Sequence, residues 1–115
     1  MTLRRDRAAA AKARRALETA QLPGNGDTQR AAALLATELI NNAVLHGLGE
    51  EITLEVTTSE GCVRVEVCDD GHGFDPSQRT EREDPGGWGL GVVDAMSDDW
   101  GVYEGSTHVW FELLT

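Results

Sequence analysis

The longest regular pattern of hydrophobic and polar positions in the chain is helical and covers residues 28–46. At roughly 100° per residue, Glu38 and Asn42 lie about 40° apart on the helical wheel. Both fall within an apolar stripe formed by Ala31, Leu34, Leu35 and Leu45. We expect this stripe to face the core and to bury a carboxylate and a carboxamide one turn apart. A buried polar group without a partner costs roughly 1–3 kcal/mol, so the pair needs neighbouring backbone, a water cluster, a metal ion or a polar ligand.

Alternating patterns after this helix predict four strands. They cover residues 51–57, 62–68, 100–103 and 107–113. The side chains expected to face inward are Ile52, Leu54, Val56, Val63, Val65, Val67, Val109, Phe111 and Leu113. Continuing the alternation of the second strand by two positions places Asp69 at the end of its buried face. Asp69 is therefore expected in the same layer as Glu38 and Asn42.

Two further helices are predicted, one before the central helix and one between the second and third strands. Residues 3–19 are rich in alanine and arginine, which favours a basic N-terminal helix within residues 1–20. Residues 90–97 predict a short helix. Helices combined with tightly connected strands predict an α+β fold, a two-layer sandwich in which a mixed, mostly antiparallel sheet carries the helices on one face. The length of 115 residues predicts a single domain over residues 1–115.

Two glycine-rich segments flank a polar loop. Gly71 and Gly73 follow Asp69 directly, and glycines at such positions allow a tight turn and a close approach to a ligand. Residues 75–84 are polar and charged without a regular pattern, which indicates a functional lid. Residues 86–91 lead into the short helix, an arrangement that holds phosphate or, without a ligand, forms a flexible turn.

Charge is unevenly distributed along the chain, whose formal net charge is −10. Seven basic and three acidic residues in 1–30 give +4, whereas three basic and seventeen acidic residues in 31–115 give −14. This acidic body argues against direct binding of nucleic acid, and a nucleotide would need a divalent cation to enter it. The basic N-terminal segment would contact an acidic partner or form only a solvated face.

Hydropathy and cysteine content indicate a cytoplasmic protein. No apolar run reaches the roughly 18 residues of a membrane span, so no membrane partner is expected. Cys62 and Cys68 are too few for a disulfide framework and favour reduced thiols.

Three segments stand in a set order: Glu38-x-x-x-Asn42 on a helix, Asp69-x-Gly71-x-Gly73 after a strand, and Gly87-x-Gly89-x-Gly91 before a helix. Together they resemble the Bergerat ATP-binding fold shared by gyrase, Hsp-type chaperones, sensor histidine kinases and mismatch-repair ATPases. The resemblance covers roughly residues 13–114. The segments most similar to one branch, the anti-sigma-factor kinases of bacteria, are residues 37–47, 86–90, 99–102 and 107–113.

The resemblance implies a site for ATP and Mg²⁺ and a role for each matching residue. Asn42 would coordinate Mg²⁺, and Glu38 would act as general base or orient the nucleophile. Asp69 would accept a hydrogen bond from the adenine amino group. The other cofactor-binding residues implied are His46, Gly71, Gly73, Arg79, Gly87, Gly89, Leu90, Gly91 and Thr107. Residues 70–90 would form the ATP lid.

The resemblance also implies a function: a serine/threonine kinase that phosphorylates an anti-anti-sigma protein and sequesters a sigma factor. The family further suggests a homodimer. Alternatives are a non-catalytic, nucleotide-dependent switch, a detached histidine-kinase catalytic domain, and a structural domain without a ligand. The sequence departs from the family pattern because no lysine follows Lys12, His108 stands where relatives often carry lysine, and Trp88 stands where a basic residue is common. Arg79 and Arg82 remain as candidates for contact with the γ-phosphate.

Overall fold

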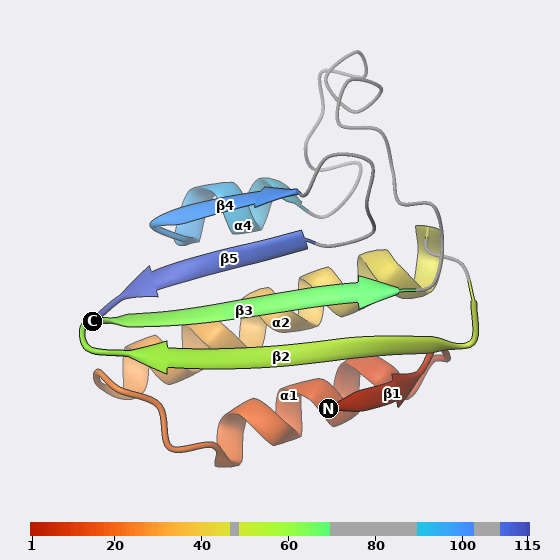
Figure 1. Ribbon diagram of the computed structural model, residues 1–115, viewed down its shortest axis with the longest axis horizontal. Helices are drawn as coiled ribbons and strands as arrows, with labels where there is room; N and C mark the ends of the chain where they lie inside the picture. Colours follow the sequence, from red (N-terminus) through yellow and green to blue (C-terminus); the bar gives the residue numbers. More distant parts are fainter. Residues whose placement is uncertain (47–48, 70–89, 103–108) are drawn as a thin grey trace.

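The computed structural model describes residues 1–46, 49–69, 90–102 and 109–115 (Figure 1). The elements in these ranges are, in chain order, β1 (Thr2–Arg4), α1 (Ala9–Thr19), α2 (Gly26–His46), β2 (Glu51–Ser59), β3 (Cys62–Asp69), α4 (Leu90–Met96), β4 (Asp99–Val102) and β5 (Val109–Leu114).

The strands form one sheet in the order β1-β2-β3-β5-β4, and every neighbouring pair in the described residues is antiparallel. The helices lie on one face of this sheet, where α2 packs on β3 and is flanked by α1 and α4 (Figure 1). The predicted two-layer α+β fold is confirmed. The described part of the sheet is purely antiparallel rather than mixed. The first strand, β1, also joins it antiparallel to β2.

The alternation predicted for the strands is the alternation that builds the core. The inward residues of β3 and β5 are at most 6% exposed, and they pack against the apolar side of α2. The largest fully buried side chains of the core are Phe111, Leu17, Leu35, Leu39, Ile40 and Ile52. A turn at Gly61, with φ of 81°, joins β2 to β3, and this left-handed backbone favours glycine. The amide groups that begin α2 are capped by Asn25, whose Oδ1 accepts from the N–H groups of Asp27 and Thr28.

The prediction of a helix over residues 3–19 was wrong at its start. Leu3 lies in β1, is 4% exposed and pairs with Ile52 of β2, and α1 begins only at Ala9. Burial of Leu3 against the sheet outweighs the helical propensity of its neighbours, because propensity is a weak preference that tertiary contacts override. Asp6 then redirects the chain, since its Oδ1 accepts from the N–H of Ala8.

Three residues predicted to face the core are exposed. Leu34 is 42% exposed, Leu45 is 74% exposed and Val56 is 37% exposed. The pattern of α2 identified the correct residue types but placed the centre of the buried side incorrectly. At roughly 100° per residue, the fully buried residues of α2 centre about 130° away from Glu38.

Candidate functional site

Asn42 is the buried polar residue of α2. Its side chain is 8% exposed, and its Nδ2 has no hydrogen-bond partner among the described residues. Leu39 and Ala43, its neighbours on the same side of the helix, are also buried. Buried amides are normally hydrogen-bonded, and each exception needs an explanation. The position therefore fits a group that completes its bonding with a bound molecule.

Glu38 lies one turn before Asn42 and is partly exposed, between the buried side of α2 and the exposed Leu34. The sequence placed both residues in the middle of the core-facing stripe, whereas the structure places them at its border. This border is chemically more useful than the core, because a carboxylate there reaches an incoming substrate without the desolvation of full burial.

Asp69 is the last residue of β3, where it pairs with Ile52 and is partly exposed. Because β3 packs beneath α2, the end of this strand lies on the same side of the molecule as the C-terminal half of α2 (Figure 1). The start of β5 lies at that end as well, because Val109 pairs with Val67, and α4 begins on the same side (Figure 1). The fold thus brings the C-terminal end of α2, the end of β3 and the start of α4 to one end of the sheet.

The end of α2 is held by Arg5, a residue that the sequence analysis did not identify. Its Nε donates to the carbonyl oxygen of Gly49 at 2.6 Å, and its Nη1 donates to that of Val44 at 2.8 Å. Its backbone N–H donates to the carbonyl oxygen of Glu50 at 2.8 Å. A cation at the C-terminus of a helix satisfies carbonyls that lack an intrahelical partner and complements the helix dipole. Arg5 therefore links the last turn of α2 to Gly49 and Glu50.

The remaining predicted residues are only partly located. His46 is the last residue of α2, and Gly91 is partly exposed in the first turn of α4, directly after Leu90. The predicted residues that lie outside the described ones are Gly71, Gly73, Arg79, Arg82, Gly87, Gly89, Thr107 and His108. The same holds for the proposed lid, except for its last residue.

The described residues fit a magnesium ion that is bound mainly by a nucleotide. They contain no cluster of three or more His, Cys, Asp or Glu side chains that would form a complete metal site. Mg²⁺ is instead commonly held by one or two protein oxygens together with phosphates and water. Turning the Asn42 amide by half a rotation would exchange Nδ2 for Oδ1, since the two atoms are assigned from their bonding partners, and would place an oxygen ligand where the unpaired nitrogen lies.

Comparison with known proteins agrees with this geometry. The sequence model of one family, described as the histidine kinase-like ATPase domain, matches residues 2–113. No curated protein matches the chain. Among the described residues, no helix has the length and apolar character needed to cross a membrane. Domains of the matching family bind ATP with Mg²⁺, and the match covers nearly all of the sequence. This chain belongs to the histidine kinase-like ATPase domain family.

Proposed function

We propose that this chain binds Mg–ATP at the end of the sheet where α2 and β3 meet, and transfers the γ-phosphate to a serine or threonine of an anti-anti-sigma protein. Phosphorylation would release that partner and leave the chain free to hold a sigma factor. The observation that supports this proposal is the pairing of a buried, unsatisfied Asn42 with a partly exposed Glu38 one turn away.

Each residue of the pair has a distinct role in the proposed reaction. Asn42 would hold the cation through its side-chain oxygen, and the cation would neutralise phosphate charge in an otherwise acidic protein. Glu38, at the border of the helix's buried side, would accept the proton of the incoming hydroxyl or orient that hydroxyl towards the phosphorus. Asp69, at the end of β3, would accept a hydrogen bond from the adenine amino group.

A second candidate function is a nucleotide-dependent switch that does not transfer phosphate. Arg64 is the one Lys or Arg among the described residues of 31–115. Its guanidinium is engaged on the opposite face of the sheet, where it bonds Glu66 at 2.9 Å and Glu112 at 3.0 Å and stacks over Trp110 at 4.2 Å. No described cation of the body is thus free to stabilise a transferred phosphoryl group, which favours binding without turnover.

Phosphoryl transfer from labelled ATP to candidate anti-anti-sigma proteins separates the two functions. For a kinase, Glu38→Gln is expected to lower the transfer rate roughly 10²–10⁴-fold, the usual contribution of a general base, while Mg–ATP affinity changes only severalfold. The exposed carboxylate of α1 provides a matched control, Glu18→Gln, which should leave the rate unchanged. Equal labelling by wild type and Glu38→Gln would contradict the kinase, and tight Mg–ATP binding without any labelling would favour the switch. Acid-labile labelling would indicate histidine as the acceptor instead of serine.

A further inference from the structure

The edge of β2 next to β1 is covered over only half of its length. The register pairs Thr2, Leu3 and Arg4 with residues 51–53, and Met1 adds one more pair because its amino group and carbonyl bond the backbone of Leu54 at 2.9 and 2.8 Å. Residues 55–59 of β2 have no strand on this side among the described residues (Figure 1). In an antiparallel ladder the outward-bonding residues alternate. The backbone N–H and C=O groups of Val56 and Thr58 therefore point to this open edge.

The layer of helices leaves the same stretch of β2 uncovered. Leu54 is 3% exposed, whereas Val56, the next residue of the same inward phase, is 37% exposed. An apolar side chain in the core-facing phase of a strand is expected to be covered, whereas Val56 is only partly covered by the described residues. Exposed strand edges with unpaired backbone groups are templates for an added strand.

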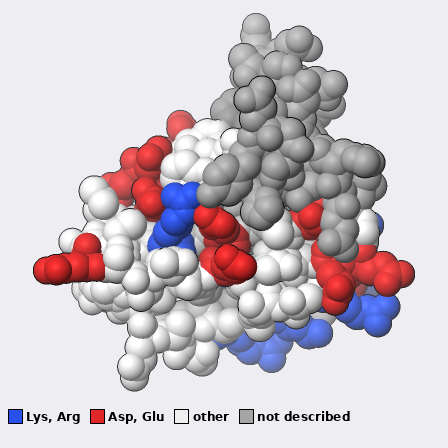
Figure 2. All heavy atoms as spheres, in the orientation of Figure 1, with Lys and Arg blue, Asp and Glu red and all other residues white. Residues whose placement is uncertain are grey.

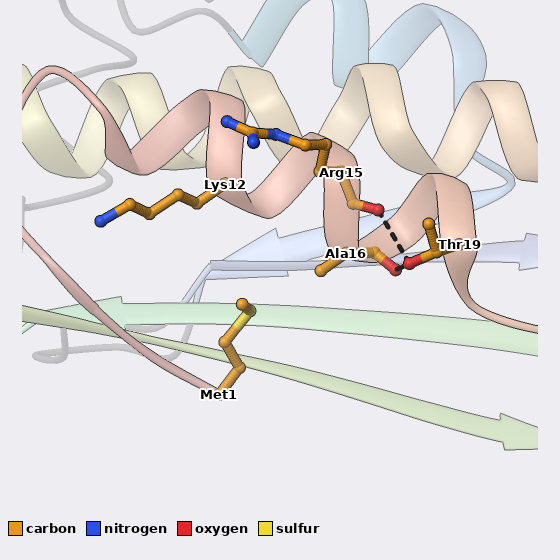
Figure 3. Close-up of a pocket in the computed structure, with 5 residues that line it drawn as sticks. All are labelled: Met1, Lys12, Arg15, Ala16 and Thr19. Carbon is orange, nitrogen blue, oxygen red and sulfur yellow. Dashed lines mark hydrogen bonds between the residues drawn. The ribbon is translucent and has the colours of Figure 1, made fainter.

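A hollow of about 340 Å³ lies where a continuation of β1 would run (Figure 3). It is lined by Met1, Lys12, Arg15, Ala16 and Thr19. The side chain of Met1 points from the strand towards α1, and the side chains of Lys12 and Arg15 extend sideways from α1 (Figure 3). Ala16 and the Met1 side chain give the hollow an apolar floor.

The rim of this hollow is basic. Lys12 and Arg15 are exposed and form no salt bridge with a described residue. Basic side chains also gather along the edge formed by α1 and β1 (Figure 2). An occupant with carboxylates would neutralise these cations. A second copy paired through the same edge would instead bring two such basic helices together, which like-charge repulsion opposes.

We propose that residues 55–59 of β2 bind an extended, acidic segment of a partner protein as an added antiparallel strand in line with β1. Backbone bonds to Val56 and Thr58 would supply most of the affinity, an apolar side chain would enter the hollow beside Met1, and carboxylates would contact Lys12 and Arg15. This surface lies apart from Glu38, Asn42 and Asp69. The proposal therefore stands whether or not the nucleotide site transfers phosphate.

Amide exchange measured by NMR on the full chain tests the backbone part of the proposal. The probe is a capped eight-residue peptide that alternates valine and glutamate, compared with one that alternates valine and lysine. In the free protein the amides of Val56 and Thr58 should exchange faster than that of Thr57, whose N–H faces β3. The glutamate peptide should slow exchange at Val56 and Thr58 and leave Thr57 unchanged. Unaltered exchange at saturating peptide, or equal protection by the lysine peptide, would overturn the proposal.

Charge reversal tests the basic rim. The double substitution Lys12→Glu with Arg15→Glu is expected to weaken binding of the glutamate peptide by roughly tenfold or more, since two exposed ion pairs are replaced by two repulsive pairs. The matched control reverses Arg7 and Arg14, which are exposed but do not line the hollow, and should change affinity by less than about threefold. Equal losses in both variants would show unspecific attraction. Protection of Val56 and Thr58 that grows with protein concentration without peptide would assign the edge to a second copy.

Discussion

Two carboxamide side chains on α2 are used in opposite ways. Near the start of the helix, Nε2 of Gln29 donates to the carbonyl oxygens of Leu17, Glu18 and Ala20 at 3.0, 2.7 and 2.8 Å. Near its end, Asn42 is more deeply buried, yet its Nδ2 has no partner among the described residues. The same functional group is fully engaged at one end of the helix and unengaged at the other.

The comparison distinguishes an amide with a structural role from one that we propose binds a ligand. The last carbonyls of any helix lack intrahelical partners, and Gln29 supplies a donor for those of α1, which ties the first two helices together. Asn42 has no such role, and an unsatisfied buried amide costs roughly 1–3 kcal/mol. A buried polar group that lowers stability and makes no structural contact is best explained by a ligand. In the matching family this ligand is Mg–ATP.

The largest expected effect follows from Asn42→Leu, which keeps the volume of the side chain and removes its polar group. Loss of an outer partner weakens a metal site about 10–100-fold, so loss of the ligand itself should weaken Mg-dependent ATP binding at least about 100-fold. The free energy of unfolding should stay within about 1 kcal/mol or increase, because the unsatisfied amide is gone. Calorimetric titration with and without Mg²⁺, together with denaturant unfolding, measures both. A loss of stability with unchanged affinity would make Asn42 structural, like Gln29.

The converse substitution, Gln29→Leu, should lower the free energy of unfolding by about 1–3 kcal/mol, because the three carbonyls lose their donor. Mg–ATP affinity should change less than about twofold, since Gln29 and Asn42 occupy opposite ends of the helix. Gln21, an exposed glutamine in the link between α1 and α2, gives the matched control Gln21→Leu, which should leave stability unchanged. A marked loss of nucleotide affinity in Gln29→Leu would contradict the assignment of a purely structural role to Gln29.

Substitution of Arg5 is expected to lower both the free energy of unfolding and the Mg–ATP affinity, each by less than the substitutions above. Arg5→Met removes the bonds to the carbonyls of Val44 and Gly49, and we expect a loss of about 1 kcal/mol in unfolding free energy and a severalfold loss of Mg–ATP affinity. Arg5→Lys should recover part of both, because the charge remains at the helix end. Arg7→Met, at an exposed position, is the control. Full affinity in Arg5→Met would show that the nucleotide site does not depend on the bonds of Arg5 to Val44 and Gly49.

The sequence predicted the elements that repeat a pattern and missed those that depend on a distant contact. The strands around Val65 and Phe111 were predicted because alternation persists over their whole length. β1 was missed because a strand of three residues is too short to show an alternating pattern. It forms by pairing with β2, where Leu3 lies opposite Ile52, far along the chain. The wheel of α2 found Asn42 by residue type but could not show which side α1 and α4 would cover.

The candidate site was predictable to the extent that it consists of side chains with a set spacing. Glu38, Asn42 and Asp69 were predicted from helical and strand periodicity, and their roles in a site stay a prediction. The structure places the ends of α2 and β3 on the same side of the molecule (Figure 1). Arg5 and Gln29 were not found, because both act on backbone carbonyls. A carbonyl is present at every residue, so its position in space carries no signature in the sequence.

The smallest expected effect concerns the start of β3, the end of the strand opposite Asp69. Burial raises the pKa of the Cys62 thiol, the Glu112 carboxylate raises it further, and Arg64 partly opposes this shift. As pH rises above about 8.5, the thiol loses its proton in the unfolded state before it does so in the folded state. The stability that Cys62 contributes is therefore present below that pH and is lost as pH rises through the folded-state pKa. One group changes the free energy of unfolding by at most about 1.4 kcal/mol per pH unit, and this partly exposed thiol should contribute a fraction of that limit.

Denaturant unfolding between pH 7 and 10 should show a shallower decline of the unfolding free energy in Cys62→Ser than in wild type, with Mg–ATP affinity altered equally in both. An identical decline in the two proteins would place the alkaline sensitivity elsewhere, and a difference in affinity would mean that the two ends of β3 are coupled.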